Sequence, residues 1–306
     1  MPIAPLKGPL RVGVMNKTGV LLMAHGTPSS MDEMPEYLRL VRGGRPPSPE
    51  LVAEMRHNYE AIGGRSPLTD LTMRQAEALR ERLGPDVAVA VGMRNWKPFI
   101  AQALDGLRTA GISRVVAIPL APQFSTLSIG KYFAAAAAAL AQGMELVRVD
   151  SFYLHPLLLQ AFAERVRAVR PGVGEEVVFT AHSLPKRVVD EGDSYVDEVA
   201  ATARGVAALA GIDTFQIAYQ SAGRTPEPWI GPDIGDFIRE RSKAGARSFV
   251  VAPIGFVCDH TEILFDIDVQ AKAAADQAGA SLRRTESLNT SAPFIAMLED
   301  LVRTRL

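Results

Sequence analysis

The segment LLMAHGTP at residues 21–28 has a partial copy in the same chain, VFTAHSLP at residues 178–185. Each copy begins with apolar residues typical of a buried strand, and each contains a histidine that is followed three residues later by a proline. A second pair of similar segments comes in the same order, VVAIPLAPQF at residues 115–124 and FVVAPIGFVC at residues 249–258. This repetition predicts two similar lobes.

The boundary between the lobes is expected in the Pro- and Gly-bearing stretch at residues 156–175. We therefore predict two domains, an N-terminal lobe at residues 1–155 and a C-terminal lobe at residues 156–306. A chain of 306 residues with 47% hydrophobic content can bury a core large enough for either two domains or one large α/β unit.

Seven nearly continuous apolar runs predict strands that are covered on both faces, and helical patterns lie between them. The runs occupy residues 19–25, 87–93, 114–122, 146–152, 176–182, 215–221 and 248–256. One helix is expected at residues 69–83, with Thr69 or Asp70 as its N-cap and Gly84 at its end. This alternation predicts an α/β fold with parallel sheets, in which ligands bind beyond the carboxyl ends of the strands.

Composition excludes several classes of partner and site. The net charge is −1 and no Lys/Arg-rich run occurs, which argues against a nucleic-acid partner. The single Cys258 cannot form an internal disulfide, and one thiol cannot hold a structural zinc ion or an iron–sulfur cluster. Residues 1–19 do not resemble a signal peptide, and the apolar run at residues 132–141 is too short to cross a bilayer. We expect a cytoplasmic protein without membrane insertion.

Polar residues at the predicted strand ends argue for proton or metal chemistry. Ser183 follows His182, but the sequence AHSLP lacks the G-x-S-x-G turn of a serine hydrolase. Neither G-x-x-x-x-G-K-[ST] nor G-x-G-x-x-G follows the first strand, so nucleotide binding loses its main support. A neutral imidazole and several carboxylates remain, and such groups move protons and divalent metal ions.

The segment DHTEILFDIDVQ at residues 259–270 places Glu262, Asp266 and Gln270 four residues apart on an otherwise apolar element. In an α-helix each four-residue step turns 400°, so this polar stripe drifts by about 40° per step. A π-type turn would straighten the stripe, and such turns favour functional sites. The alternative on spacing alone is the solvated face of an amphipathic helix.

Five motifs in this order resemble the ferrochelatases, which insert ferrous iron into a porphyrin. The motifs are LLMAHGTP, YEAIGGRSPLTDLTMRQAEAL (59–79), FTAHSLP (179–185), YQSAGRTPEPWIGP (219–232) and APIGFVCDHTEILFDID (252–268). The resemblance implies two Rossmann-like lobes with the porphyrin in the cleft between them, and the C-terminal lobe carries the catalytic residues. Residues 37–64 resemble the short soluble bacterial branch that uses coproporphyrin III, being charged where membrane-associated enzymes carry an apolar lip.

The resemblance also implies roles for individual residues. His182 and Glu262 correspond to the family's essential catalytic pair, which with Asp266 would bind the metal and pass on protons. Which of the pair binds iron first and which takes the protons stays open. Gln270 stands where the family usually has a third acidic residue. Porphyrin contacts are expected from His25, Arg42, Tyr59, Ser66, Thr126 and Tyr132.

Two of these porphyrin contacts have a specific expected chemistry. Arg42 is the candidate to bind a propionate, because a guanidinium matches a carboxylate in bidentate fashion. His25 stands where related enzymes commonly place Tyr or Met, and an imidazole there is a ligand for the iron of the finished product.

Three alternatives to coproporphyrin III metallation stay open at this point: a protoporphyrin IX ferrochelatase, a cobalt chelatase for a related tetrapyrrole, and a non-catalytic porphyrin or haem carrier. We expect no cofactor beyond the substrate Fe²⁺, and no iron–sulfur cluster. The partners expected are the porphyrin and Fe²⁺ as substrates, for a monomer with transient contacts to neighbouring haem-pathway enzymes.

Overall fold

The computed structural model describes residues 17–223 and 225–306. Most of the N-terminal stretch that we judged unlike a signal peptide, residues 1–16, lies outside the described part. Across the described residues, no helix has the length and apolar character needed to cross a membrane.

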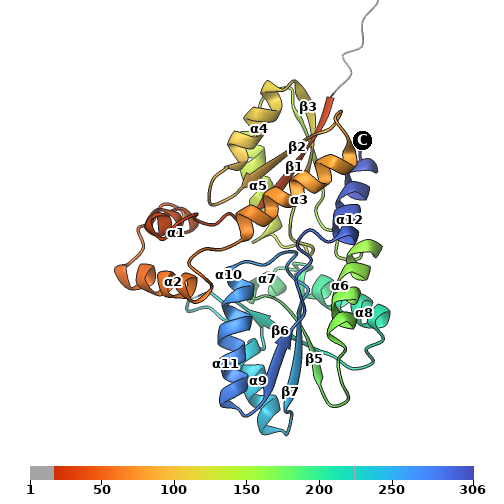
Figure 1. The fold of residues 1–306 in the computed structure, drawn as a ribbon. Helices are drawn as coiled ribbons and strands as arrows, with labels where there is room; N and C mark the ends of the chain where they lie inside the picture. The colour runs from red at the N-terminus through yellow and green to blue at the C-terminus, as the bar shows by residue number, and fades with distance from the viewer. Residues whose placement is uncertain (1–16, 224) are drawn as a thin grey trace, which may run out of the picture.

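Two four-stranded parallel sheets lie one above the other (Figure 1). The first sheet has the order β2-β1-β3-β4 and the second β6-β5-β7-β8, so the second repeats the first with every strand four places later. Their strands are β1 (Lys17–Ala24), β2 (Ala88–Met93), β3 (Ile112–Pro119), β4 (Glu145–Arg148), β5 (Glu176–His182), β6 (Gln216–Gln220), β7 (Ser248–Pro253) and β8 (Ser281–Arg284). This repeated order confirms the expected α/β fold of two similar lobes.

The seven predicted strands all form, and β5 has the predicted bounds, residues 176–182. Most of the other runs extend past the carboxyl end of their strand, because the chain stays apolar where it enters the loops. The predictions missed β8, which pairs with β7 at the edge of the second sheet. Its sequence SLRR carries two arginines and gives no apolar run.

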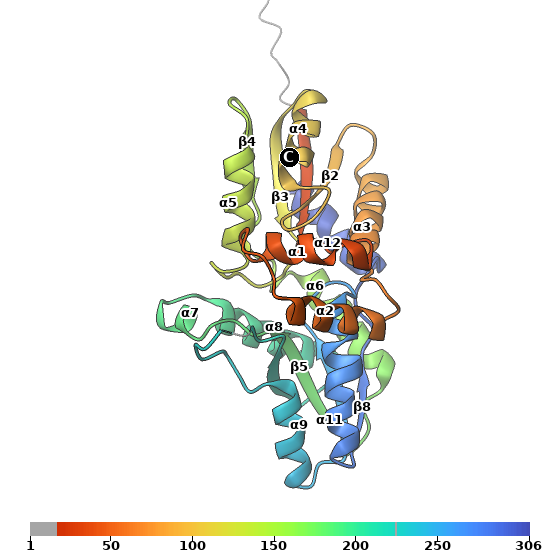
Figure 2. The same cartoon turned by 90° about the vertical axis from the view of Figure 1, so that its left-hand side faces the viewer.

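Helices cover both faces of the two sheets (Figures 1 and 2). Those of the first half are η1 (Met31–Glu33), α1 (Met34–Val41), α2 (Pro49–Ala61), α3 (Leu68–Leu83), α4 (Ile100–Thr109), α5 (Ile129–Ala139) and α6 (Pro156–Val169). Those of the second half are α7 (Arg187–Asp190), α8 (Tyr195–Ala210), α9 (Ile234–Lys243), α10 (Thr261–Leu264), the π-helix η2 (Asp266–Ala271), α11 (Lys272–Gln277) and α12 (Ala292–Arg303).

The start of α3 differs from the prediction. Its N-cap position is Pro67, whose side chain makes no capping hydrogen bond, and Thr69 and Asp70 lie inside the helix. Asp70 instead pairs with Arg65 at 2.7 Å. The end of the helix is as expected, because Gly84 follows it with φ = 83°, a conformation that suits glycine.

One hydrophobic cluster runs through both lobes and joins the facing sides of the two sheets. It includes Leu22 of β1, Leu79 of α3, Phe162 of α6, Phe179 of β5 and Leu298 of α12. Separate clusters fill the opposite faces, beneath α4 and α5 in the first lobe and beneath α9, η2 and α11 in the second. The shared core fixes how the lobes face each other, and the proposed boundary at residues 155 and 156 stays a prediction.

Candidate active site

A cavity of about 780 Å³ opens between the two lobes, beyond the carboxyl ends of β1 and β5. This is the size of a site for a cofactor-sized ligand. Two glycines at its edge let the backbone approach closely. A Cβ atom on Gly26, which follows His25, would lie 2.8 Å from the Cβ of Met93, and one on Gly255 would lie 2.7 Å from Ala181. Larger residues there would clash with Met93 and Trp96 in the first lobe and with Ala181 in the second.

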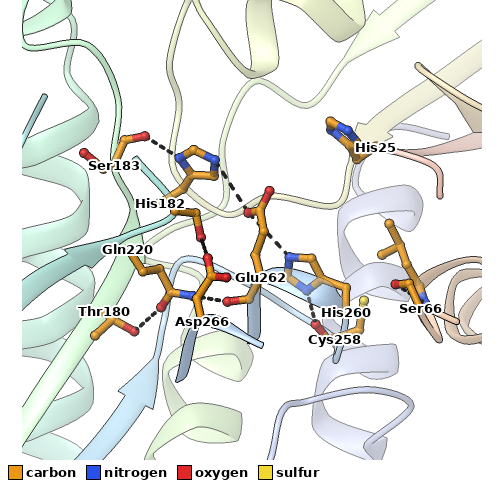
Figure 3. Close-up of polar contacts among 12 residues, drawn as sticks. His25, Ser66, Thr180, His182, Ser183, Gln220, Cys258, His260, Glu262 and Asp266 are labelled. Carbon is orange, nitrogen blue, oxygen red and sulfur yellow. Dashed lines mark hydrogen bonds and ion pairs between the residues drawn. The ribbon is translucent and has the colours of Figure 1, made fainter. Parts of the chain in front are cut away.

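His182 is the last residue of β5 and points into the cavity (Figure 3). Its Nδ1 atom contacts the carbonyl oxygen of Ser183, and its own carbonyl accepts a 2.8 Å hydrogen bond from Tyr195. An Nδ1–H that donates to this carbonyl leaves the lone pair on Nε2. That atom lies 3.5 Å from Oε2 of Glu262.

Glu262 lies between imidazoles. Besides His182, the Nε2 atom of His260 lies 3.7 Å from the same Oε2 atom. Burial alone would raise the pKa of Glu262, but the facing His182, His260 and His25 outweigh burial and lower this pKa to about 2. Glu262 is therefore ionised at neutral pH. Its backbone is fixed as well, because the Gln220 side-chain amide donates to the Glu262 carbonyl and Thr180 donates to Gln220 at 2.8 Å.

His260 was not among the predicted site residues. Its Nδ1 atom lies 3.0 Å from the carbonyl oxygen of Cys258, so its ring is held from behind while Nε2 faces Glu262. Burial lowers its pKa, but the hydrogen bond to Glu262 and the charge of that carboxylate raise the pKa above the ordinary value. One signal in the sequence could have found it, the position of a histidine two residues before Glu262, but the direction in which its ring points depends on the fold.

Asp266 begins the π-helix η2, in which the amide of Gln270 donates to the Phe265 carbonyl five residues earlier at 2.9 Å. Of the two possibilities left open by the spacing, the structure thus forms the π-type turn within this segment. The Ser221 hydroxyl donates to Asp266. Burial and the nearby charge of Glu262 raise the pKa of Asp266 to about 7, against the opposing effect of that hydrogen bond.

A second, smaller cavity of about 260 Å³ lies on the other side of Asp266. Its lining includes Ser221, Asp233, Arg239 and Gln270, and Asp266 lines both cavities. The three stripe residues Glu262, Asp266 and Gln270 therefore run from the larger cavity to the smaller one. A carboxyl group that titrates near pH 7 at their junction can receive a proton on one side and release it on the other.

His25 follows β1 at the position equivalent to His182, and it faces the cavity from the opposite lobe (Figure 3). Its Nε2 atom lies 3.1 Å from the Tyr37 hydroxyl, and the Asn95 side-chain nitrogen lies 3.2 Å from Nδ1. Burial and the charge of Arg94 lower the pKa of His25 to about 4. The imidazole is therefore neutral at pH 7 and keeps a lone pair.

The other predicted porphyrin contacts divide into two groups. Tyr59 and Tyr132 line the cavity with His25. Arg42, Ser66 and Thr126 are not among the lining residues: Arg42 is exposed after α1, Ser66 is buried and accepts a hydrogen bond from the Leu68 amide, and Thr126 binds Asp193 at 2.9 Å. The motifs do not specify which of these side chains reach the cavity.

Four cationic residues line the cavity that are not among the expected porphyrin contacts. They are Arg45, Arg94, Lys131 and Arg187. Arg187 pairs with Glu227 at 3.1 Å, whereas the Nε atom of Arg94 is buried with no hydrogen-bond partner in the part of the chain that is described. The guanidinium carbon of Arg94 lies 5.4 Å from the ring centre of Tyr132. Only the fold brings these four positions, which lie on different elements, around one space.

Two solved structures share this fold. CbiX, the terminal enzyme of siroheme biosynthesis in denitrifying bacteria, superposes with a TM-score of 0.55 at 17% identity, covering 94% of this chain and 99% of the other. The sirohydrochlorin chelatase SirB from Bacillus subtilis subspecies spizizenii, in complex with cobalt, gives 0.55 at 10% identity and covers 94% of each chain. At these identities the likeness concerns the fold alone.

Sequence comparisons identify the family. A protein from Acidobacterium capsulatum named ferrochelatase is 43% identical over 311 residues, which cover 95% of each chain. A ferrochelatase from Deinococcus radiodurans is 40% identical over 94% of this chain and 95% of its own. The coproporphyrin III ferrochelatase of Geobacillus kaustophilus is 38% identical over 95% of this chain and 97% of its own. Because the family model named Ferrochelatase also matches residues 17–306, the chain belongs to the ferrochelatase family.

Proposed function

We propose that this enzyme metallates coproporphyrin III. His182 and Glu262 together bind the metal ion and receive the protons that leave the ring centre. Its family membership makes the protein an enzyme that inserts ferrous iron into a porphyrin, with release of two protons. It also removes the cobalt chelatase and the non-catalytic carrier from consideration. Relatives named coproporphyrin III ferrochelatases, such as that of Geobacillus kaustophilus, support the choice of porphyrin.

The observation that carries the choice of porphyrin is the set of cations around the cavity. Coproporphyrin III has four propionates, whereas protoporphyrin IX has two and carries vinyl groups in place of the others. Arg45, Arg94, Lys131 and Arg187 come from four separate positions in the two lobes. Carboxylates at several edges of the ring suit such a distribution, because each charged hydrogen bond favours the substrate that can accept it.

The spacing of His182 and Glu262 suits a metal ion that two ligands share. Two ligand atoms roughly 2.1 Å from one ion at a tetrahedral angle stand about 3.4 Å apart. The Nε2 and Oε2 atoms are 3.5 Å apart, and both carry lone pairs when the histidine is neutral. The same pair can instead receive the protons that leave the porphyrin nitrogens, since a proton placed between them is shared by both groups.

Protons taken up at this pair need a route to water that does not pass the porphyrin. Glu262 has a low pKa and passes on a proton readily, and Asp266, with a pKa of about 7, is the next acceptor along the stripe. Asp266 also lines the second cavity, where water can take the proton away. Each proton therefore moves from the ring centre through Glu262 and Asp266 towards the second cavity.

An anaerobic assay with Fe²⁺ and either coproporphyrin III or protoporphyrin IX, followed by metalloporphyrin absorbance, tests the substrate. We expect a higher kcat/KM for coproporphyrin III without detergent. A higher value for protoporphyrin IX under these conditions would overturn the choice of porphyrin. Absence of insertion into either one would overturn the catalytic assignment. We further propose that the enzyme acts without a resident cofactor; its one cysteine, Cys258, is buried, and burial raises the pKa of this thiol to about 12.

A further inference from the structure

The segment that carries Glu262 and Asp266 crosses the carboxyl end of the second sheet and is tied to both edge strands. The edges of this sheet are β6 and β8. On the β6 side, Ser221, the residue after β6, donates to Asp266. On the β8 side, the tie is Arg284, the last residue of β8. Figure 2 shows β8 beside α11, which continues η2.

The guanidinium of Arg284 holds two carboxylates that flank the catalytic residues. Its Nε and Nη2 atoms donate to the two oxygens of Asp268 at 2.7 and 2.9 Å, and its Nη1 atom lies 3.3 Å from Oδ1 of Asp259. Asp268 lies in the π-helix and Asp259 precedes α10, so Glu262 and Asp266 lie between the two anchor points. Only 13% of the Arg284 side chain is exposed, so solvent screens its bidentate ion pair with Asp268, a carboxylate fork, only weakly.

The two anchor points are not equally well supported. Asp259 also accepts hydrogen bonds from Ser287 at 2.7 Å and from Asn289 at 2.9 Å, so it would stay in place without the arginine. For Asp268, Arg284 is the partner whose bonds the structure records. Loss of Arg284 therefore releases the π-helical end of the segment and leaves its start in position.

Release of that end matters because π-helical turns are rare and contain one residue more than an α-helical turn. If the turn relaxed to α-helix, the residues on its two sides would rotate relative to each other by about 100°, the angle of one residue. Glu262 and Asp266 would then no longer form one path from the ring centre to the second cavity. Displacements of about 1 Å at such a site cost roughly a hundredfold in rate.

We propose that Arg284 is a positioning residue for metal insertion: by gripping Asp268 and Asp259 it holds the π-helical turn in the register that aligns Glu262 with Asp266. Arg284 does not line the larger cavity, so it acts through the segment that it holds. The inference rests on the proposed roles of Glu262 and Asp266. It predicts that Arg284 affects turnover and leaves porphyrin affinity unchanged.

The neighbouring Arg283 supplies a matched control. It lies on the same strand and pairs with Glu175, and it also donates to the Val169 and Arg170 carbonyls, away from the catalytic segment. Arg283→Met and Arg284→Met thus remove the same side chain and one carboxylate fork each. Melting temperature, coproporphyrin III affinity by fluorescence quenching, kcat and KM are to be measured for both variants and for Arg284→Lys.

We expect both methionine variants to melt at a lower temperature than wild type. Only Arg284→Met should have a lower kcat, by roughly tenfold to a hundredfold. Its KM and its porphyrin affinity should stay within about threefold of wild type. Arg284→Lys keeps the charge without the fork and should recover part of the lost kcat. If Arg284→Met and Arg283→Met have the same kcat, the inference is wrong. Should Arg284→Met not fold, Asp268→Asn takes its place, and an unchanged kcat in that variant also overturns the proposal.

Glu262→Gln, assayed in the same series, separates this inference from the proposed function. If Glu262→Gln is inactive and Arg284→Met matches Arg283→Met, only the role of Arg284 fails. If Glu262→Gln inserts iron at the wild-type rate, the catalytic role of Glu262 fails, and the inference about Arg284 fails with it.

Discussion

The Nε2 atom of His182, at the end of β5, lies 3.5 Å from the Oε2 atom of Glu262, at the start of α10. The two residues are far apart in sequence and meet because parallel strands bring their carboxyl ends to one edge of the sheet. The imidazoles around Glu262 lower its pKa to about 2, so the carboxylate is ionised at neutral pH. The pair therefore offers one nitrogen and one oxygen lone pair to the same space.

The first prediction concerns the pH dependence of turnover. Asp266 can accept a proton only when ionised, and its pKa is raised to about 7 by burial and by the charge of Glu262. We expect kcat to rise between about pH 6 and pH 8 with an apparent pKa near 7. Asp266→Asn should lower kcat roughly tenfold or more and abolish this rise. A pH profile of the same shape in the variant would contradict the relay through Asp266.

The second prediction concerns stability and follows from the same pKa. The folded-state pKa of about 7 exceeds the ordinary value of 3.8, so the stability that protonated Asp266 contributes is fully present below about pH 4 and is lost as the pH rises to about 7. Asn cannot ionise, so Asp266→Asn should be more stable than wild type above pH 7. We expect the free energy of unfolding to increase by on the order of 2 kcal/mol. This is about half of the free energy that corresponds to the full pKa shift, because the carboxyl is partly exposed to solvent.

Denaturant unfolding at pH 5 and at pH 8.5 checks this stability prediction. The difference between Asp266→Asn and wild type should be larger at pH 8.5. A larger gain at pH 5 would mean that Asp266 is ionised at low pH in the folded protein. Asp276→Asn, on the exposed side of α11, is a suitable control for which we expect a small difference.

The third prediction concerns the finished product. His25 is neutral because its pKa is about 4, and it faces the cavity from the lobe opposite His182. Its Nε2 atom can bind the iron of the product after giving up the contact with Tyr37. Bound iron coproporphyrin III should therefore show an imidazole-ligated absorbance spectrum that changes in His25→Ala. We expect this variant to release product faster and to keep substantial insertion activity.

An identical spectrum with and without the imidazole would assign His25 to strand-end packing with Tyr37 and Asn95. Tyr37→Phe provides the complementary test. It removes the hydroxyl that competes for Nε2, and so it should strengthen the imidazole signature of bound product.

The fourth prediction concerns propionate recognition by Arg94, whose Nε atom lacks a hydrogen-bond partner among the described residues. Arg94→Gln should raise KM for coproporphyrin III about tenfold, because a charged hydrogen bond is worth roughly 1.5–3 kcal/mol. The kcat should change less. Arg108→Gln, which breaks a surface pair with Asp105 outside the cavity, is the control. Equal KM values for the two variants would assign the propionates to other cations.

Much of this fold can be predicted from the sequence because buried parallel strands leave a strong pattern. The run at residues 176–182 has the bounds of β5, and the duplicated segments occupy equivalent strands in two sheets of identical order. The edge strand β8 escapes prediction, since a four-residue strand with two arginines has no apolar run. The same short strand carries Arg284.

The candidate site divides along similar lines. Four-residue spacing is compatible with an amphipathic α-helix or with a π-type turn, and only the fold shows the π-helical turn at Asp266. Sequence motifs could not separate the cavity-lining Tyr132 of α5 from Thr126 in the loop before it, which instead binds Asp193, since motifs do not specify which side chains reach the cavity. Arg94 follows the predicted strand at residues 87–93, at an end where ligands are expected, but the motifs did not assign it to the porphyrin, because its place in the cavity depends on how β2 is placed beside β1.

The most direct test of the catalytic pair is to compare insertion and porphyrin binding in Glu262→Gln. The substitution keeps the size of the side chain and removes its charge, while Glu227→Gln makes the same change at the cavity wall beside Arg187. The assay uses coproporphyrin III and Fe²⁺ under anaerobic conditions. We predict that Glu262→Gln binds the porphyrin nearly as tightly as wild type does but loses most of its insertion activity. The expected loss in kcat is a hundredfold or more, because a group that transfers protons typically contributes ~10²–10⁴ to the rate. Glu227→Gln should lose much less. Insertion by Glu262→Gln at a rate close to that of Glu227→Gln would contradict the assignment of His182 and Glu262 as the site of metal and proton exchange.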